Sequence, residues 1–229
     1  MAAAPPSREI EPPLRILTPR QRERRERIQA ATFELLARHG GDMLSMKLIA
    51  QTAGVAERTL FNIYGSKDRL FAFSARERSE ETISEAHRDG GMGLGFFMIL
   101  PRKLADKTFE APELARAFAP ILVEHADMVG LPEVYEHFAG GALRAMRPSG
   151  QVAVDDIAFV SRLICMSMVG TVVLWAKREI ADAALETHLR LAICQVLLPY
   201  AEPPLDDTLR EQAREHTRSL SRSVSERLA

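Results

Sequence analysis

The sequence lacks the features that mark secreted and membrane-spanning chains. Its 229 residues include two cysteines, too few to suggest a disulfide-stabilised secreted scaffold. The longest charge-free run of the C-terminal half, Leu163–Ala176, has 14 residues, whereas a spanning helix needs about 20. The opening Met-Ala-Ala-Ala-Pro-Pro segment has neither the basic start nor the apolar stretch of a signal peptide. We therefore expect a cytoplasmic protein without a membrane partner.

Catalytic motifs are absent as well. The chain has no G-x-S-x-G elbow, no phosphate loop and no metal-ligand triad, so we expect neither an enzyme nor a cofactor or metal site. The glycine-rich segment Asp89–Gly95 lacks the G-x-G-x-x-G spacing of a dinucleotide loop and would follow a helix rather than a strand. We expect it to be a mobile connector or an entrance to a cavity.

Proline and strand-like alternation are missing over long stretches. No proline occurs from Arg20 to Leu100, which permits long helices. No alternating apolar and polar run or internal repeat emerges, so the sequence predicts an all-α protein. After a long helix from Ser66 to about Arg88, we expect helices at about 96–107, 112–128, 131–147, 155–179 and 182–200.

Residues 45–67 predict two short helices joined by a tight turn. Ser45 can cap the first helix through its hydroxyl, and Leu48 and Ile49 give that helix an apolar face. Gly54 tolerates the positive φ that suits a turn between two steeply crossing helices. The second helix is expected over Glu57–Tyr64.

The outer face of this second helix offers hydrogen-bonding groups. Arg58, Thr59 and Asn62 are short or fork-shaped side chains of the kind that reach base edges in a major groove. The alternative is a small helical hairpin whose polar residues are merely solvated. We predict double-stranded DNA as the partner, because the segments on either side of this helix also match a DNA-binding protein, as described next.

The distribution of charge favours the same region. The net charge is −1, yet residues 1–70 hold 12 Lys+Arg and 8 Asp+Glu, against 18 and 23 in the remainder. Arg24 and Arg25 belong to an arginine-rich start of the first helix that could follow phosphates or enter a minor groove. Interleaved Glu23 and Glu26 leave a solvated helix face with i,i+4 ion pairs as the alternative.

Three segments carry a resemblance to a known family: RERRERIQAATFELLARHG (Arg22–Gly40), LIAQTAGV, and TLFNIYGSKDRL (Thr59–Leu70). They resemble the tetracycline-repressor (TetR) family of bacterial transcriptional regulators, in detail over Arg22–Leu70 and only in architecture afterwards. The resemblance implies a three-helix helix-turn-helix head followed by a helical ligand-binding and dimerisation domain. We predict an N-terminal arm without fixed structure over residues 1–19, the DNA-binding head over 20–82, the regulatory domain over 83–203 and a charged tail over 204–229, with helical spacing of its apolar residues.

The end of the recognition helix matches the family with departures. The family has an aromatic pair three residues apart and then a lysine that meets a phosphate, and Phe61, Tyr64 and Lys67 match these positions. Phe61 cannot make the phosphate bond of the usual tyrosine, whereas Tyr64 either sits in the core or supplies a hydroxyl. Ala56 lacks a capping oxygen, a loss that costs about 0.5–2 kcal/mol. The predicted DNA-binding residues are Arg24, Arg25, Ser45, Lys47, Arg58, Thr59, Phe61, Asn62, Tyr64 and Lys67.

The last two helices of the regulatory domain are rich in apolar residues. The segment 155–179 is apolar nearly all round, which predicts burial on more than one side, and 182–200 has a one-sided apolar stripe. The resemblance implies that these helices pair with their copies in a homodimer, whereas intramolecular packing is the alternative. Two recognition helices in a dimer would read a roughly palindromic site.

The aromatic and methionine residues between positions 96 and 175, which include Tyr135 and Met168, could line an apolar cavity. Core packing is the alternative for each of them. Cys165 and Cys194, at similar depths on the last two helices, raise the hypothesis of a thiol switch, against the alternative of inert buried thiols. The predicted ligand-binding residues are Phe96, Phe97, Phe118, His125, Phe138, Arg162, Met166 and Trp175.

Together these inferences predict a homodimeric, sequence-specific transcriptional regulator. The resemblance implies a repressor that a small effector releases from a palindromic operator, and the cavity composition favours an apolar effector. The alternative is an architectural or interaction protein that binds DNA without effector control.

Overall fold

A computed structural model describes residues 18–41 and 43–228 of the chain. These residues form helices and connecting segments, with one isolated β-bridge between Val152 and Ala201 and no strand among them. The all-α prediction is confirmed. The predicted N-terminal arm lies outside the described residues, apart from Thr18 and Pro19. The helices are α1 Pro19–His39, α2 Met46–Thr52, α3 Glu57–Tyr64, α4 Lys67–Gly90, α5 Leu94–Glu110, α6 Pro112–Glu124, α7 Ala126–Val129, α8 Leu131–Met146, α9 Ile157–Ala176, α10 Leu185–Leu197 and α11 Leu205–Leu228, with short 3-10 helices at Asp182–Ala184 and Leu198–Tyr200.

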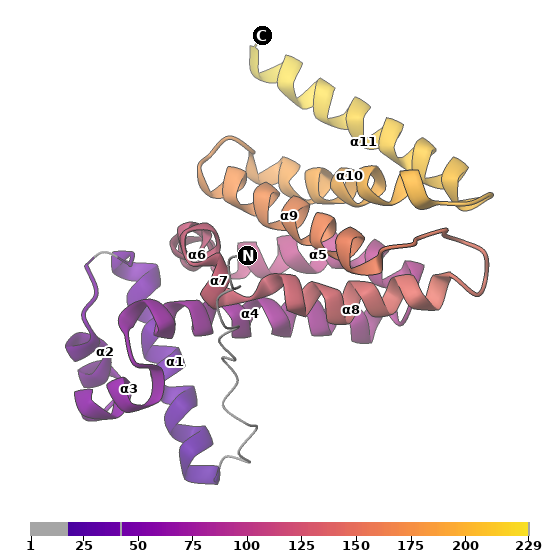
Figure 1. The fold of residues 1–229 in the computed structure, drawn as a ribbon. Helices are drawn as coiled ribbons and strands as arrows, with labels where there is room; N and C mark the ends of the chain where they lie inside the picture. The colour runs from indigo at the N-terminus through magenta and orange to yellow at the C-terminus, as the bar shows by residue number, and fades with distance from the viewer. Residues whose placement is uncertain (1–17, 42, 229) are drawn as a thin grey trace, which may run out of the picture.

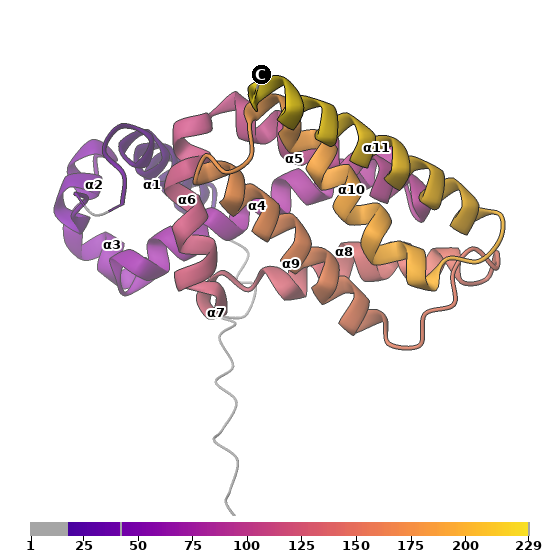
Figure 2. The same ribbon diagram turned by 90° about the horizontal axis from the view of Figure 1, so that it is seen from above.

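The helices form a small head and a larger body. Helices α1, α2 and α3 gather at one end of the molecule, and α4 runs from this head into the body beside α5 and α8 (Figure 1). Helices α9 and α10 pack together over this layer, and α11 crosses α10 on the outside (Figure 2). Helix α4 is continuous from Lys67 to Gly90, so the predicted domain boundary between residues 82 and 83 falls within a helix.

Local sequence signals explain where several helices begin. Thr18 and Gln21 form a capping box at α1, and the Ser45 hydroxyl accepts a hydrogen bond from the Leu48 N–H at α2. The Ser66 hydroxyl caps α4 in the same way. Helix α3 begins at Glu57 as predicted, and Ala56 makes no side-chain cap. Its first turn therefore relies on the favourable position of the Glu57 carboxylate near the positive end of the helix dipole.

Two of the helices expected from the sequence are not continuous α-helices in the structure. The helix expected over 112–128 ends at Glu124, because His125 leaves helical geometry (φ −120°, ψ 32°), and α7 then ends at Gly130 in the left-handed conformation. The helix expected over 182–200 starts and ends with 3-10 turns, so its α-helical part is confined to Leu185–Leu197.

Helix α9 is the most apolar helix of the body, and much of it faces outward. Its mean hydropathy is 2.1 over an 18-residue window of which 28% is buried, so by length and composition alone it could cross a membrane. Helices that pack in a protein core or interface have the same composition. Helix α9 is longer than the charge-free run Leu163–Ala176, because the helix begins at Ile157 and includes Arg162. Met166 is 69% exposed, and Phe159 and Leu174 are also exposed.

The glycine-rich segment is a tight turn between α4 and α5. A Cβ atom on Gly90 would lie 2.5 Å from the Gly95 carbonyl oxygen, and a Cβ on Gly95 would collide with the Gly90 carbonyl. The two helices therefore approach backbone to backbone at this point, which only glycine allows. Contrary to expectation, the segment does not border the cavity described below.

We expect Gly95→Ala to lower the free energy of unfolding by about 1–3 kcal/mol, because its methyl group must push apart two backbones. Gly141→Ala on α8 is the matched control, since a Cβ there meets no atom within 4 Å, and alanine should be neutral or stabilising by up to about 1 kcal/mol. Urea unfolding followed by circular dichroism measures both changes. Equal stability of the two variants would contradict the close approach.

Candidate nucleic-acid interface and internal cavity

The turn between α2 and α3 has helix-turn-helix geometry. Gly54 has a φ of +64°, and the Val55 N–H donates to the Ala50 carbonyl across the turn at 3.0 Å. Ile49 and Leu60 are fully buried beneath the turn. This small core fixes the angle between α2 and α3 and leaves the outer face of α3 uncovered within the described chain.

The exposed face of α3 carries polar groups that have no partner within the described residues. Arg58 and Asn62 are exposed and make no hydrogen bond or ion pair there. Phe61 is 46% exposed beside them, whereas Thr59 is half-buried. On α2, Lys47 is exposed. The exposed side chains of α3 can therefore contact a ligand without breaking an existing interaction.

The first helix also presents unpaired positive charge. Arg20, Arg22, Arg24 and Arg27 are exposed. Within the described chain, the ion pair recorded on α1 is Arg38 with Glu34 near its other end. The i,i+4 pairs that Glu23 and Glu26 could have formed are not present, so these arginines remain available to phosphates.

Tyr64 and Arg25 lie at the junction of α1, α3 and α4. Tyr64 is 8% exposed and its ring centroid lies 5.5 Å from that of Phe73. Burial raises the pKa of Tyr64 to about 12, and the Arg25 charge acts in the opposite direction. The Arg25 guanidinium lies 5.9 Å from the Phe73 ring centroid. The Tyr64 ring therefore packs in the core, which is the first of the two roles predicted for this residue.

Lys67 occupies the first turn of α4, where it links two parts of the head. Its ammonium donates a hydrogen bond to the Gly41 carbonyl at 3.3 Å and lies 5.7 Å from the Phe71 ring centroid. The α4 N-terminus and the Lys67 charge lie together, and both favour an anion. This is the environment that a phosphate contact requires.

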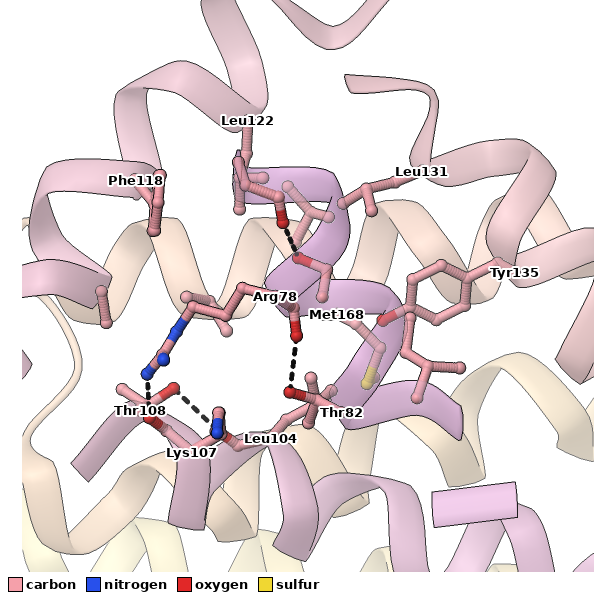
Figure 3. Close-up of a pocket in the computed structure, with 16 residues that line it drawn as sticks. Arg78, Thr82, Leu104, Lys107, Thr108, Phe118, Leu122, Leu131, Tyr135 and Met168 are labelled. Atoms are coloured by element: carbon pink, nitrogen blue, oxygen red, sulfur yellow. Dashed lines mark hydrogen bonds between the residues drawn. The ribbon is translucent and has the colours of Figure 1, made fainter. Parts of the chain in front are cut away.

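A cavity opens inside the body, between α4, α5, α6, α8 and α9 (Figure 3). The space not occupied by atoms is about 650 Å³, a volume that includes open solvent at its mouth. Most of its wall is apolar. The lining residues are Ala75, Arg78, Ser79, Thr82, Ile83, Leu104, Lys107, Thr108, Ala115, Phe118, Leu122, Leu131, Tyr135, Met168, Val169 and Val172.

Of the eight predicted ligand-binding residues, Phe118 lines this cavity. Phe96 and Phe97 are fully buried against each other in the core, and Phe138 packs between His87 and His137. The structure places the remaining four elsewhere because their helices turn them away. His125 ends α6, Arg162 and Met166 are exposed on α9, and Trp175 is buried beneath the Arg116 guanidinium at 4.6 Å.

The cavity includes residues that sequence reasoning missed. Tyr135 and Met168 belonged to the wider aromatic and methionine set, but Arg78, Thr82 and Thr108 carried no signal of their own. Arg78 and Thr82 stand four residues apart on α4, so they lie on the same face of that helix. Such a pair of polar residues on a helix that must be buried could have indicated a polar cavity wall.

The two cysteines are free thiols in buried positions. Burial raises the pKa of Cys165 to about 12 and also raises that of Cys194, whose sulfur lies 3.8 Å from the Gln212 amide oxygen. A protonated thiol is a poor nucleophile, so these environments favour the inert alternative over a thiol switch. Within the described part of the chain, no group of three His, Cys, Asp or Glu side chains could hold a metal ion.

Comparison with known proteins identifies a family model for the head of the molecule. Residues 28–72 match the family model for bacterial regulatory proteins of the tetR family, which confirms the resemblance found in the sequence. No curated protein has a matching sequence.

Solved structures share the fold well beyond the matched segment. A TetR transcriptional regulator from Rhodococcus sp. RHA1 has a TM-score of 0.63 at 17% identity, covering 78% of this chain and 97% of its own. SmeT, the repressor of the Stenotrophomonas maltophilia multidrug efflux pump SmeDEF, has a TM-score of 0.57 at 19% identity, with coverages of 79% and 92%. The fatty acid degradation regulator FadR from Bacillus halodurans has a TM-score of 0.59 at 17% identity, with coverages of 73% and 97%. At these identities the likeness concerns the fold.

The positions of Tyr64 and Phe61 lead to opposite expectations for two matched substitutions. Tyr64→Phe should leave DNA affinity within about twofold, because the ring packs in the core. Phe61→Tyr should strengthen binding by about two- to tenfold, because it adds a hydroxyl donor at an exposed position on α3, the predicted recognition helix. Fluorescence anisotropy on one duplex measures both. A marked loss of affinity in Tyr64→Phe would instead place its hydroxyl on the DNA.

Proposed function

We propose, on the premise that residues 28–72 form a TetR-family DNA-binding domain on a TetR-family fold, that the protein is a homodimeric, sequence-specific transcriptional regulator of the cytoplasm. It represses transcription from a roughly palindromic operator and is released by a small effector. The observation that carries the proposal is the outer face of α3, where Arg58 and Asn62 are exposed and unpaired on a rigid helix-turn-helix.

The head contributes two kinds of contact. Arg58, Thr59 and Asn62 read base edges in the major groove, for which the fork of arginine and the amide of asparagine are suited. Ser45, Lys47, Phe61 and Lys67 position the head on the sugar-phosphate backbone, together with Arg24 on α1. Arg25 has a structural role instead, because its guanidinium lies over the Phe73 ring and stabilises the junction of α1 and α4.

Helices α9 and α10 form the dimer interface of the proposal. Met166, Phe159 and Leu174 are exposed apolar side chains on one helix, and a second copy would remove them from water. Burial of such side chains contributes about 1.5–3 kcal/mol each. The dimer is essential to function because it sets the spacing of the two recognition helices.

The cavity connects to the head through packed contacts. Phe118 lines the cavity and meets Phe33 of α1 edge to face, with ring centroids 5.6 Å apart. Arg76 on α4 donates hydrogen bonds to the carbonyls of Val129 and Gly130 at 3.2 Å and 2.9 Å. An effector that moves α6 or α4 would thus change the spacing of the two heads. It must bind the released state more tightly than the DNA-bound state in order to shift the population.

Selection of bound duplexes from a random DNA pool by the purified protein tests the central claim, with affinity then followed against salt. We expect a palindrome whose half-sites are separated by about one helical turn or more. Recovery of no enriched sequence, with only steeply salt-dependent binding, would favour the alternative of an architectural DNA-binding protein without effector control.

Substitution of Arg58 and of Lys67 should separate base reading from phosphate contact. Lys67→Ala should weaken binding to all sequences and lower the salt slope by about one for each lysine removed. Arg58→Ala should cost about 1–3 kcal/mol and relax the preference at one base position per half-site. Arg102→Ala on α5, an exposed residue paired with Asp106, is the control and should change neither property. A Lys67→Ala effect confined to one base position would contradict the phosphate role.

The dimer interface is tested by placing a charge on the exposed face of α9. Met166→Glu should yield a monomer at micromolar concentration and lower operator affinity by more than about tenfold, because a carboxylate would be buried without a partner. Met92→Glu is the control, since Met92 is 64% exposed in the turn between α4 and α5. Sedimentation velocity and anisotropy measure the two effects. A dimer that survives Met166→Glu would place the interface elsewhere.

A further inference from the structure

The polar side chains that line the cavity come from α4 and α5, apart from that of Tyr135. Arg78, Ser79 and Thr82 come from α4, and Lys107 and Thr108 come from α5. The walls formed by α6 and α9 are apolar, and α8 contributes one polar group, the phenol of Tyr135. A molecule that fills this cavity therefore meets apolar surface over most of its body and polar groups at one end (Figure 3).

Most of these polar groups are already engaged within the protein. The hydroxyls of Ser79, Thr82 and Thr108 each donate to the carbonyl four residues earlier in their own helix. The Lys107 ammonium is paired with the Glu110 carboxylate at 3.1 Å and with the Glu81 carboxylate at 3.9 Å. The three hydroxyl donors are thus spent on neighbours, and the Lys107 charge is already balanced by two carboxylates.

Arg78 is different because its guanidinium has spare donors. One terminal nitrogen donates to the Lys107 carbonyl at 2.8 Å, and the described residues include no carboxylate within ion-pairing distance of it. An arginine carries five N–H donors in a planar fork, so several remain unused. Burial lowers the pKa of Arg78, with Glu110 and Glu81 acting in the opposite direction. A desolvated cation without a direct counter-ion is a strong binding point for an anion.

Tyr135 supplies a second free donor on the other side of the cavity (Figure 3). Its phenol makes no hydrogen bond within the described residues, and burial raises its pKa well above the usual value. The group therefore remains a protonated donor and offers no negative charge that would oppose an anion.

We propose that the cavity binds an organic monocarboxylate, with the carboxylate on the Arg78 guanidinium and an aliphatic or aromatic body against α6, α8 and α9. This inference rests on the proposed effector role and names the chemical class of the effector. A guanidinium fork matches the two oxygens of a carboxylate. A phosphate dianion fits less well, because the site offers one uncommitted cation and has the Glu81 and Glu110 carboxylates close by.

Calorimetric titration of the purified protein without DNA tests the proposal with matched acid and alcohol pairs. The pairs are decanoate with decanol, phenylbutanoate with phenylbutanol, and naphthylacetate with naphthylethanol. Within each pair the carbon skeleton is the same, and a neutral hydroxymethyl group replaces the carboxylate. We expect at least one acid to bind about tenfold or more tightly than its alcohol, since hydrogen bonds to charged groups are the stronger kind. No preference for the acid in any pair, or no binding at all, would overturn the proposal.

The variant Arg78→Gln assigns the preference to one residue. Glutamine keeps an N–H donor but loses the charge, so the ratio of acid to alcohol affinity should fall about tenfold or more, while the alcohol still binds. Arg102→Gln on the exposed face of α5 is the control and should keep the ratio. If Arg78→Gln does not fold, Arg78→Lys replaces it, with a severalfold loss of acid affinity expected from loss of the fork. An unchanged ratio in a folded Arg78 variant would overturn the assignment.

The binding measurement contains no DNA, so it separates this inference from the proposed function. Failure of operator selection together with acid binding that depends on Arg78 would refute the regulator and leave the carboxylate site standing. A recovered operator without any preference for acids would do the reverse. When both succeed, addition of the bound acid should release the operator duplex from the protein, and Arg78→Gln should require about tenfold more acid for the same release.

Discussion

The burial of helix α4 along its length is the constraint on which the rest of the structure depends. Leu70 and Phe71 pack into the head, and Ile83 and Ala86 pack into the body. A fully buried leucine or isoleucine contributes about 1.5–3 kcal/mol, so neither end of α4 can leave its surroundings cheaply. The helix thus joins the head and the cavity into one framework, and any displacement of it changes the packing at both ends.

Two of the helices that line the cavity, α4 and α6, also contact the head. Arg78 and Thr82 line it from α4, and Phe118 lines it from α6 while touching Phe33 of the head. Well-packed contacts of this kind shift between discrete arrangements rather than deforming continuously. Under the proposed function, a molecule in the cavity would act directly on α4 and α6, which also contact the head.

Agreement between sequence and structure was best where the signals are local. The cap at Ser45, the turn at Gly54 and the span of α3 depend on residues within one or two turns of each other. The cavity was harder to predict. Composition indicated aromatic and methionine material, yet Phe96 and Phe97 went to the core and Met166 to the surface.

By itself the sequence determined the all-α class, the helix-turn-helix and the residues on the outer face of α3, because helical period, caps and turn glycines act over short distances. Tertiary structure alone decided which side chains surround the cavity. The rotation of each helix about its axis follows from packing against all its neighbours at once. That packing turned Arg78 toward the cavity and left its guanidinium beside the Lys107 carbonyl with donors to spare.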